Sequence, residues 1–230
     1  MLRTLFDFMT LFIIGSISGW ILELFYRRIV HKKWINPGYL SGPWLPIYGF
    51  GIVILYLVSI FQVDIWVKIT LIFIGMTLIE YIVGIFFLKV MHMKLWDYSK
   101  MWGNVQGVIC PLFSIIWGAL GAVFVYLLQT PLTDFINFID KGNYFLFPIG
   151  FLTGAFTLDL IHSCNIGRMI SSIAQKAHQV LNFQNFKNFI KDNDHRKGKF
   201  IIPIRYGTDL KEKITAFLHH FSSKDKKDKN

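Results

Sequence analysis

The chain has 230 residues, of which 53% are hydrophobic and only 17% charged, with a mean hydropathy of +0.46. About a quarter of the residues of a soluble domain are charged, so this composition argues against an ordinary soluble protein. The formal charge is +10, of which +8 falls in residues 168–230 and only +2 in residues 1–167. An apolar body with a basic tail is typical of an integral membrane protein beside anionic lipid, and it disfavours nucleic acid as the partner.

Five apolar runs approach the length of about 20 residues that a bilayer span requires. They cover residues 5–26, 46–62, 67–90, 108–129 and 144–166. The first run is too long for the apolar core of a signal peptide, so we interpret it as a retained helix. Basic residues follow the first and third runs and fill the tail, whereas acids occupy the other connections. The positive-inside rule then predicts five helices, with the N-terminus outside and the C-terminus in the cytoplasm.

The first connection, WINPGYLSGPWLPIYGFG (residues 34–51), is rich in proline and glycine between two apolar runs. Non-helical backbone at membrane depth must be buried in protein or line a cavity, because lipid cannot bond its free N–H and C=O groups. The segment therefore predicts either a loop that dips into the inner leaflet or a rigid connector with an aromatic belt. The residues that shape it are Pro37, Gly38, Gly42, Pro43, Pro46 and Gly49.

A second segment repeats this pattern. Residues 42–49 and 107–114 both read G-x-x-x-P-apolar-aromatic-small, with the glycines at Gly42 and Gly107 and the prolines at Pro46 and Pro111. A histidine and a tryptophan precede each segment, and an acid lies within each preceding apolar run. This similarity predicts two helix–loop–helix repeats in the same orientation, an arrangement from which transporter folds are often built.

Several motifs carry a resemblance to a known family. They are Glu23 with Tyr26-Arg27, NPGYLSGPWLPIYGFG (36–51), EYIVG (80–84), LWDYS (95–99), and Asn104, Gly107, Ile109-Cys110, Ser114 and Trp117-Gly118. The chain resembles the ABC-transporter type IV family of small, multi-pass bacterial membrane proteins. The resemblance covers about residues 15–125 and implies a permease-like protein in a bacterial plasma membrane, energised by an ATPase on another chain. Val108 and Pro111 depart from the arginine and leucine expected there, which removes an arginine that would bind an anion.

Ionisable side chains inside apolar runs are rare and mark candidate sites. Glu80 lies mid-way along the third run, Asp159 and His162 share one face of the fifth, and Glu23 precedes Arg27 by one helical turn. They either line a polar cavity for a cation, a proton or a head group, or make structural bonds, such as a Glu23–Arg27 ion pair. The candidate cavity or binding residues are Glu23, Arg27, Tyr48, Glu80, Asp97, Tyr98, Asn104, Asp159 and His162.

The tail predicts a separate unit, residues 168–230, after a transmembrane domain of residues 1–167. Residues 170–190 place apolar side chains on one stripe, with Lys176 and Lys187 off it, which indicates an amphipathic helix on the inner leaflet. Thr208 is a candidate cap for a short helix at 209–221, and the charged end is typical of disorder.

No P-loop, zinc-protease or serine-hydrolase motif occurs in the sequence, and its histidines and cysteines lack metal-site spacing. We therefore expect neither cofactor nor metal, and an enzyme is not the favoured interpretation. The first hypothesis is a permease-like component without its own ATPase, and the sequence also leaves room for an oligomer. One alternative is a scaffold that recognises lipid head groups or a membrane partner. Another is a lipid-modifying enzyme with Asp159, His162 or Glu80 as acid and base.

Overall fold

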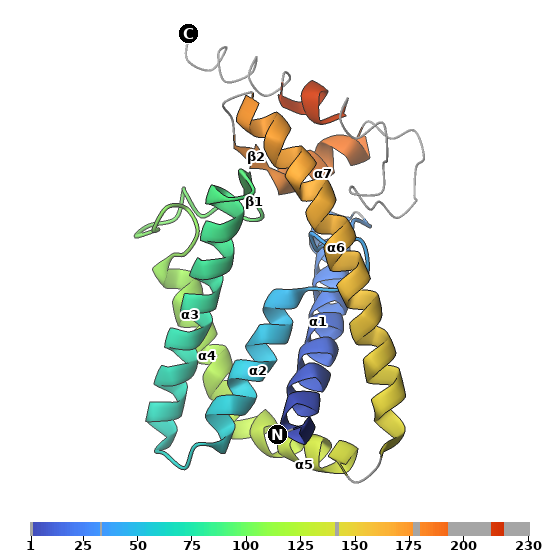
Figure 1. Cartoon of the computed structure of the whole chain (residues 1–230). Helices are drawn as coiled ribbons and strands as arrows, with labels where there is room; N and C mark the ends of the chain where they lie inside the picture. Colours follow the sequence, from blue (N-terminus) through green and yellow to red (C-terminus); the bar gives the residue numbers. More distant parts are fainter. Residues whose placement is uncertain (1, 33, 141–142, 177–179, 193–212, 219–230) are drawn as a thin grey trace.

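The computed structural model describes residues 2–32, 34–140, 143–176, 180–192 and 213–218 (Figure 1). Its helices are α1 (Leu2–His31), α2 (Pro46–Ile60), α3 (Ile65–Lys89), α4 (Pro111–Val123), α5 (Gln129–Asp140), α6 (Leu146–Lys176) and α7 (Phe183–Asp192). A π-helical turn, η1 (Phe124–Leu128), joins α4 to α5, and a 3-10 turn, η2 (Asn143–Phe145), precedes α6. Two short strands, β1 (Met93–Lys94) and β2 (Leu181–Asn182), form a parallel pair.

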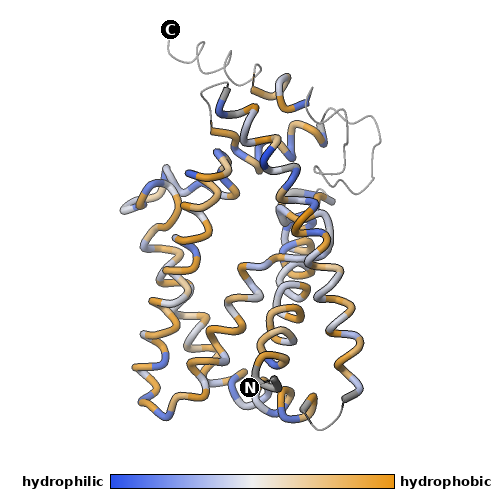
Figure 2. The backbone as a smooth tube through the Cα atoms, in the orientation of Figure 1, coloured by the Kyte–Doolittle hydropathy of each residue, from blue (hydrophilic) through white to orange (hydrophobic). Residues whose placement is uncertain are grey.

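The described part of the chain is a helical membrane bundle, as the composition predicts. Four helical stretches are long and apolar enough to cross a bilayer, at Leu5–Val30, Ile65–Lys89, Pro111–Ile139 and Leu146–Ile173. The fifth apolar helix, α2, has only 15 residues and is too short to span a bilayer core of about 30 Å. Figure 2 shows apolar residues along the whole bundle, with polar residues concentrated near its two ends.

The first four helices form two hairpins that run in the same direction, α1 with α2 and α3 with α4 (Figure 1). Pro46 and Pro111 each lie in the first turn of the second helix of their hairpin, where the missing N–H costs nothing. Small residues bring the helices close, as is usual between membrane helices. Gly49 packs on Phe12 and Ser16 of α1, and Gly121 packs on Ile72 of α3. The predicted parallel repeat is therefore present.

The prediction that the fourth helix ends near residue 129, followed by a connection at 130–143, is wrong. The helix continues through η1 into α5, which lies across the end of the bundle near the N-terminus (Figure 1). Pro131 lies shortly after η1 in this continuous helix, and prolines and π turns both occur where a helix departs from regular α geometry. Ile136 and Ile139 are buried while Asp134 is exposed, so α5 is an amphipathic helix that covers this end.

The single amphipathic helix predicted over 170–190 is also wrong. Helix α6 continues to Lys176, and the chain then forms β2 and α7. Strand β2 pairs with β1, with Met93 opposite Leu181, so the apolar side chains of the tail pack on protein rather than on a leaflet. Ile170, Leu181, Phe183, Phe186 and Ile190 are buried in one cluster with Met91 and Met93. Residues 213–218 are helical and pack on this cluster, whereas Thr208 and the charged end lie outside the described residues.

Candidate functional site

The segment between α1 and α2 descends along α1 instead of crossing the end of the hairpin. The backbone N–H of Leu45 donates to the carbonyl of Ser16 at 3.0 Å. Ser16 is 15 residues before His31, which corresponds to ~22 Å along the helix. Ile35, Asn36, Leu40, Ser41 and Trp44 are buried. Of the two predicted arrangements, the geometry therefore favours the loop that dips into the leaflet over the rigid connector with an aromatic belt.

A single side chain, Asn36, forms hydrogen bonds with several backbone groups of this loop. Its amide nitrogen donates to the carbonyls of Leu40 and Ser41 at 2.8 and 3.2 Å, and its oxygen accepts from Gly38 N–H at 3.0 Å. The same oxygen accepts from the indole N–H of Trp20 on α1 at 2.8 Å. Backbone groups that lipid could not satisfy are thus bonded within the protein.

Asp159 holds the loop from α6. Its carboxylate accepts from the backbone N–H groups of Ser41 and Gly42, at 3.2 and 2.8 Å, and from the hydroxyl of Ser163 at 3.3 Å. No hydrogen bond joins it to His162, which is exposed on α6. The spacing of the two residues allows a hydrogen bond between them, but in the structure Asp159 bonds to the loop and to Ser163 instead.

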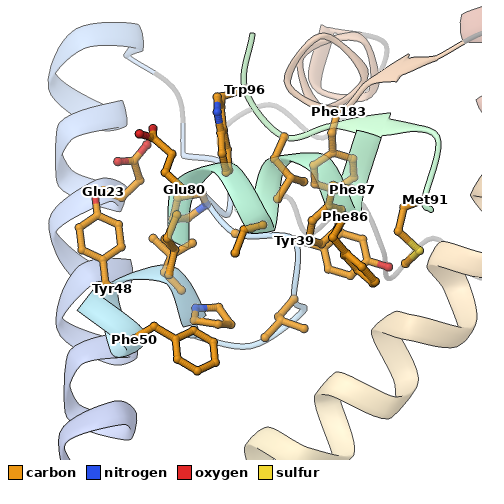
Figure 3. A pocket seen from close by; sticks show the side chains of 18 of the residues that line it. Glu23, Tyr39, Tyr48, Phe50, Glu80, Phe86, Phe87, Met91, Trp96 and Phe183 are labelled. Carbon is orange, nitrogen blue, oxygen red and sulfur yellow. The ribbon is translucent and has the colours of Figure 1, made fainter. Parts of the chain in front are cut away.

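A cavity of about 570 Å³ lies between the two hairpins, with α6 and the tail contributing to its wall. Figure 3 shows the side chains that converge on it, among them Glu23, Tyr48, Glu80 and Trp96. Of the predicted binding residues, it brings together Glu23, Arg27, Tyr48, Glu80 and Tyr98. Asp97, Asn104, Asp159 and His162 do not line it. Its remaining wall is mostly apolar and aromatic, with Tyr39, Phe50, Ile82, Phe86, Phe87, Trp96, Trp117, Leu160 and Phe183.

Glu80 is buried at the cavity wall with only 4% of its surface exposed. One carboxylate oxygen accepts from the hydroxyl of Tyr98 at 3.0 Å, and the other from the indole N–H of Trp117 at 3.1 Å. Tyr98 stacks on Phe113 with ring centroids 4.5 Å apart. Burial, with the adjacent Glu80 charge, raises the pKa of Tyr98, so its hydroxyl remains a neutral donor. Glu80 thus has two hydrogen bonds, both from uncharged groups.

The polar end of the cavity connects both hairpins to the tail. Arg27 pairs with Glu23 at 3.2 Å, as their spacing predicts, and donates to the side-chain oxygen of Gln184 at 2.8 Å. The amide nitrogen of Gln184 donates to the carbonyl of Leu95, in the second hairpin, at 2.9 Å. One residue of α7 therefore bonds to both hairpins.

Lys187, expected off the buried face of the tail, is instead only 1% exposed. Its Nζ donates to the carbonyls of Asn36 and Pro37, at 3.1 and 2.9 Å, and lies 5.0 Å from the ring centre of Phe183. Burial, with Arg27 nearby, lowers the pKa of Lys187 well below its usual value, while Glu23 opposes the shift. The tail thereby holds the loop that follows α1.

Apolar packing also joins the two hairpins directly, away from the cavity lining. Val58 of α2, Ile72 and Met76 of α3 and Phe124 of η1 form one buried cluster, further toward the N-terminal end of the bundle than Glu80. The two hairpins are thus joined by hydrogen bonds through Gln184 of the tail and by apolar contacts within the bundle.

Asp97 and Asn104 shape the loop that follows β1. Asn104 donates to the carbonyl of Met101 at 2.8 Å and accepts from Gly107 N–H at 3.0 Å, and Gly107 has a φ of +69° that favours glycine. Burial alone would raise the pKa of Asp97, but hydrogen bonds from Ser99 and Lys94 lower it. Asp97 and Asn104 therefore act on the loop and not on the cavity.

Comparison with protein families identifies the chain. The sequence profile of the family described as "Putative ABC-transporter type IV" matches residues 10–164. The chain belongs to this ABC-transporter type IV family. Comparisons with curated proteins and with solved structures gave no match.

The ABC-transporter type IV match includes both hairpins and most of α6, but it ends before β2 and α7. Gln184 and Lys187 therefore lie outside the segment that defines the family. The sequence did not point to either residue. In a basic tail, no sequence pattern distinguishes a lysine that will be buried from its exposed neighbours. Sequence reasoning also missed Asn36, although an asparagine before a proline is a known turn signal.

Proposed function

We propose that this ABC-transporter type IV protein is a permease-like component whose substrate passes through the cavity between the two hairpins. The observation that carries the proposal is the position of the cavity, in the apolar part of the bundle and against the buried acid Glu80. A charged side chain at the centre of a membrane helix costs about 3 kcal/mol on insertion scales, so such residues usually mark a path or a site.

The energy source belongs to the same proposal. The sequence contains no P-loop, so ATP hydrolysis requires a separate ATPase chain. The basic residues concentrate in the tail and in the connections beside it, and under the positive-inside rule this supports a cytoplasmic position for this end, beside anionic lipid. The ATPase would dock at this end, in the plasma membrane of a bacterium.

Thiol accessibility in native membranes tests the proposal. In a chain carrying Cys110→Ser and Cys164→Ser, Val83→Cys places a thiol in the cavity, and Ile74→Cys places one on the lipid-exposed side of the same helix. We expect a membrane-impermeant thiol reagent to label Val83→Cys from both faces of the membrane, because a transport path opens to each. Ile74→Cys should react from neither face, since a thiol in lipid does not ionise.

Labelling of Val83→Cys from one face only, or from neither, would contradict the proposal. That result would favour the scaffold, which needs no continuous path. Glu80→Gln gives a second readout, because a permease should lose transport-dependent growth or export while the amount of folded protein is unchanged.

A further inference from the structure

The cavity has the size and wall of a site for a small organic molecule. A volume of about 570 Å³ falls within the range of roughly 300–1,000 Å³ typical of ligand pockets. Aromatic rings from both hairpins face it, including Tyr48, Phe86, Trp96 and Trp117 (Figure 3). Such walls favour an apolar, flat or bulky ligand over a hydrated ion.

The charges at the cavity wall are not balanced. Glu23 and Arg27 neutralise each other at 3.2 Å. Glu80 has only the neutral donors Tyr98 and Trp117 among the described residues, so its charge has no cationic partner there. The described lining therefore presents one uncompensated carboxylate, and a buried carboxylate of this kind attracts a cation or a proton.

Part of the cavity wall lies at the apolar outer surface of the bundle, and we take this part as the mouth of the cavity. Phe50, Ile82 and Phe86 line the cavity and are nevertheless 46%, 55% and 47% exposed. All three lie on apolar helices of the bundle, Phe50 on α2 and the other two on α3, which is long and apolar enough to cross a membrane. A ligand that enters here must first dissolve in the membrane.

These three properties select one class of ligand. We infer that the cavity binds an amphipathic organic cation, which enters from the bilayer and places its positive group against Glu80 and the surrounding aromatic faces. Aromatic rings attract cations through their negative faces, most strongly where water is excluded. The inference rests on the proposed permease function, since it names the substrate class of the same cavity.

A pair of isosteric ions provides the test. The purified full chain in lipid nanodiscs is titrated with tetraphenylphosphonium, a lipophilic cation, and with tetraphenylborate, an anion of the same shape. We expect the cation to quench tryptophan fluorescence saturably and the anion to bind at least tenfold more weakly. Glu80→Gln should weaken cation binding by on the order of tenfold, which is the effect of losing about one strong charged contact.

Asp134→Asn is the matched control, because it removes the same charge from an exposed acid on α5, away from the cavity. Its affinity for the cation should equal that of the unmodified chain. If Glu80→Gln does not fold, Phe86→Ala replaces it, since Phe86 is half exposed and lines the mouth, and it should weaken binding severalfold.

Equal binding of both ions, or equal effects of Glu80→Gln and Asp134→Asn, would overturn the inference. A phospholipid that co-purifies and is not displaced by the cation would overturn it too, and would make the cavity a lipid site. Either result leaves the two-face labelling of Val83→Cys intact, so failure of the ligand class is distinguishable from failure of the permease function.

Discussion

Lys187 shows how far one side chain of the tail reaches into the bundle. It crosses from α7 to the loop after α1 and donates to two consecutive carbonyls, of Asn36 and Pro37. The same loop carries Ser41 and Gly42, whose N–H groups donate to Asp159. The loop is therefore bonded from both sides, by a carboxylate of α6 and by an amine of α7.

The lowered pKa of Lys187 makes tail docking depend on pH. An undocked lysine has a pKa of about 10.4, so between the two values the undocked state binds more protons than the docked one. Docking should therefore strengthen as pH rises toward about 10 and weaken as pH falls through the lowered pKa. Hydrogen exchange of the α7 amides at several pH values, corrected for intrinsic rates, measures this.

Lys187→Met should abolish that pH dependence, because the titrating group is gone. Lys191→Met, a change of the same kind on the same helix, should keep it. A slope that persists in Lys187→Met would assign the titration to another group.

For individual residues, the sequence could predict only interactions between side chains that are close together along the chain. Glu23 and Arg27 are four residues apart on one helix, and their ion pair follows from that spacing. Asp159 binds residues 117 and 118 positions earlier, and Lys187 binds residues about 150 positions earlier. Such pairs depend on how the helices pack, which periodicity in a single sequence does not specify.

At the level of elements, the α1–α2 contact depends on glycine. A Cβ added at Gly49 would lie 2.5 Å from the backbone oxygen of Phe12, which has no freedom to move away. At Gly150 and Gly154 of α6, an added Cβ meets nothing within 4 Å. The same substitution should therefore have opposite effects at the two sites.

We expect Gly49→Ala to lower the free energy of unfolding by about 1–3 kcal/mol, the usual cost of overpacking. Gly154→Ala should be neutral or stabilise the protein by up to about 1 kcal/mol, because alanine favours helix. Thermal unfolding in detergent, followed by loss of helical signal, compares the two. Equal effects would mean that the α1–α2 interface adjusts without cost.

The order of the apolar helices could be predicted, because hydropathy and length determine it. The ends of α5 and α7 could not. The helix that starts as α4 continues past residue 129 as α5 because Ile136 and Ile139 cover the end of the bundle. The 170–190 stripe is interrupted because Leu181 pairs with Met93. In both cases a contact with a distant element overrides the local pattern.

At the level of the whole molecule, the structure brings three segments to one end: the loop after α1, the loop after α3, and the tail (Figure 1). Helix α5 and the start of α6 lie at the other end, with the N-terminus (Figure 1). Trp102, Asn185 and Tyr144 are exposed reporters of these two ends.

Impermeant labelling of single cysteines should follow this division. In the background without native cysteines, Trp102→Cys and Asn185→Cys should both react from the cytoplasmic face, and Tyr144→Cys only from the outer face. Reaction of Trp102→Cys and Asn185→Cys from opposite faces would be incompatible with the pairing of β1 and β2. If each of the three cysteines reacted from the face opposite to the one expected, the fold would stand, but the membrane orientation predicted from the basic residues would be wrong.

The contacts that join the two hairpins differ in chemistry between the apolar cluster and the tail, and this gives the molecule an asymmetry of response. Hydrophobic contacts such as those of Val58, Ile72 and Phe124 are insensitive to protons and salt near neutral pH. The bonds of Gln184 to Arg27 and Leu95 belong to a segment whose anchoring lysine titrates. A change of pH, or a protein that binds α7, should therefore alter the contacts between the tail and the two hairpins and leave the apolar cluster unaffected.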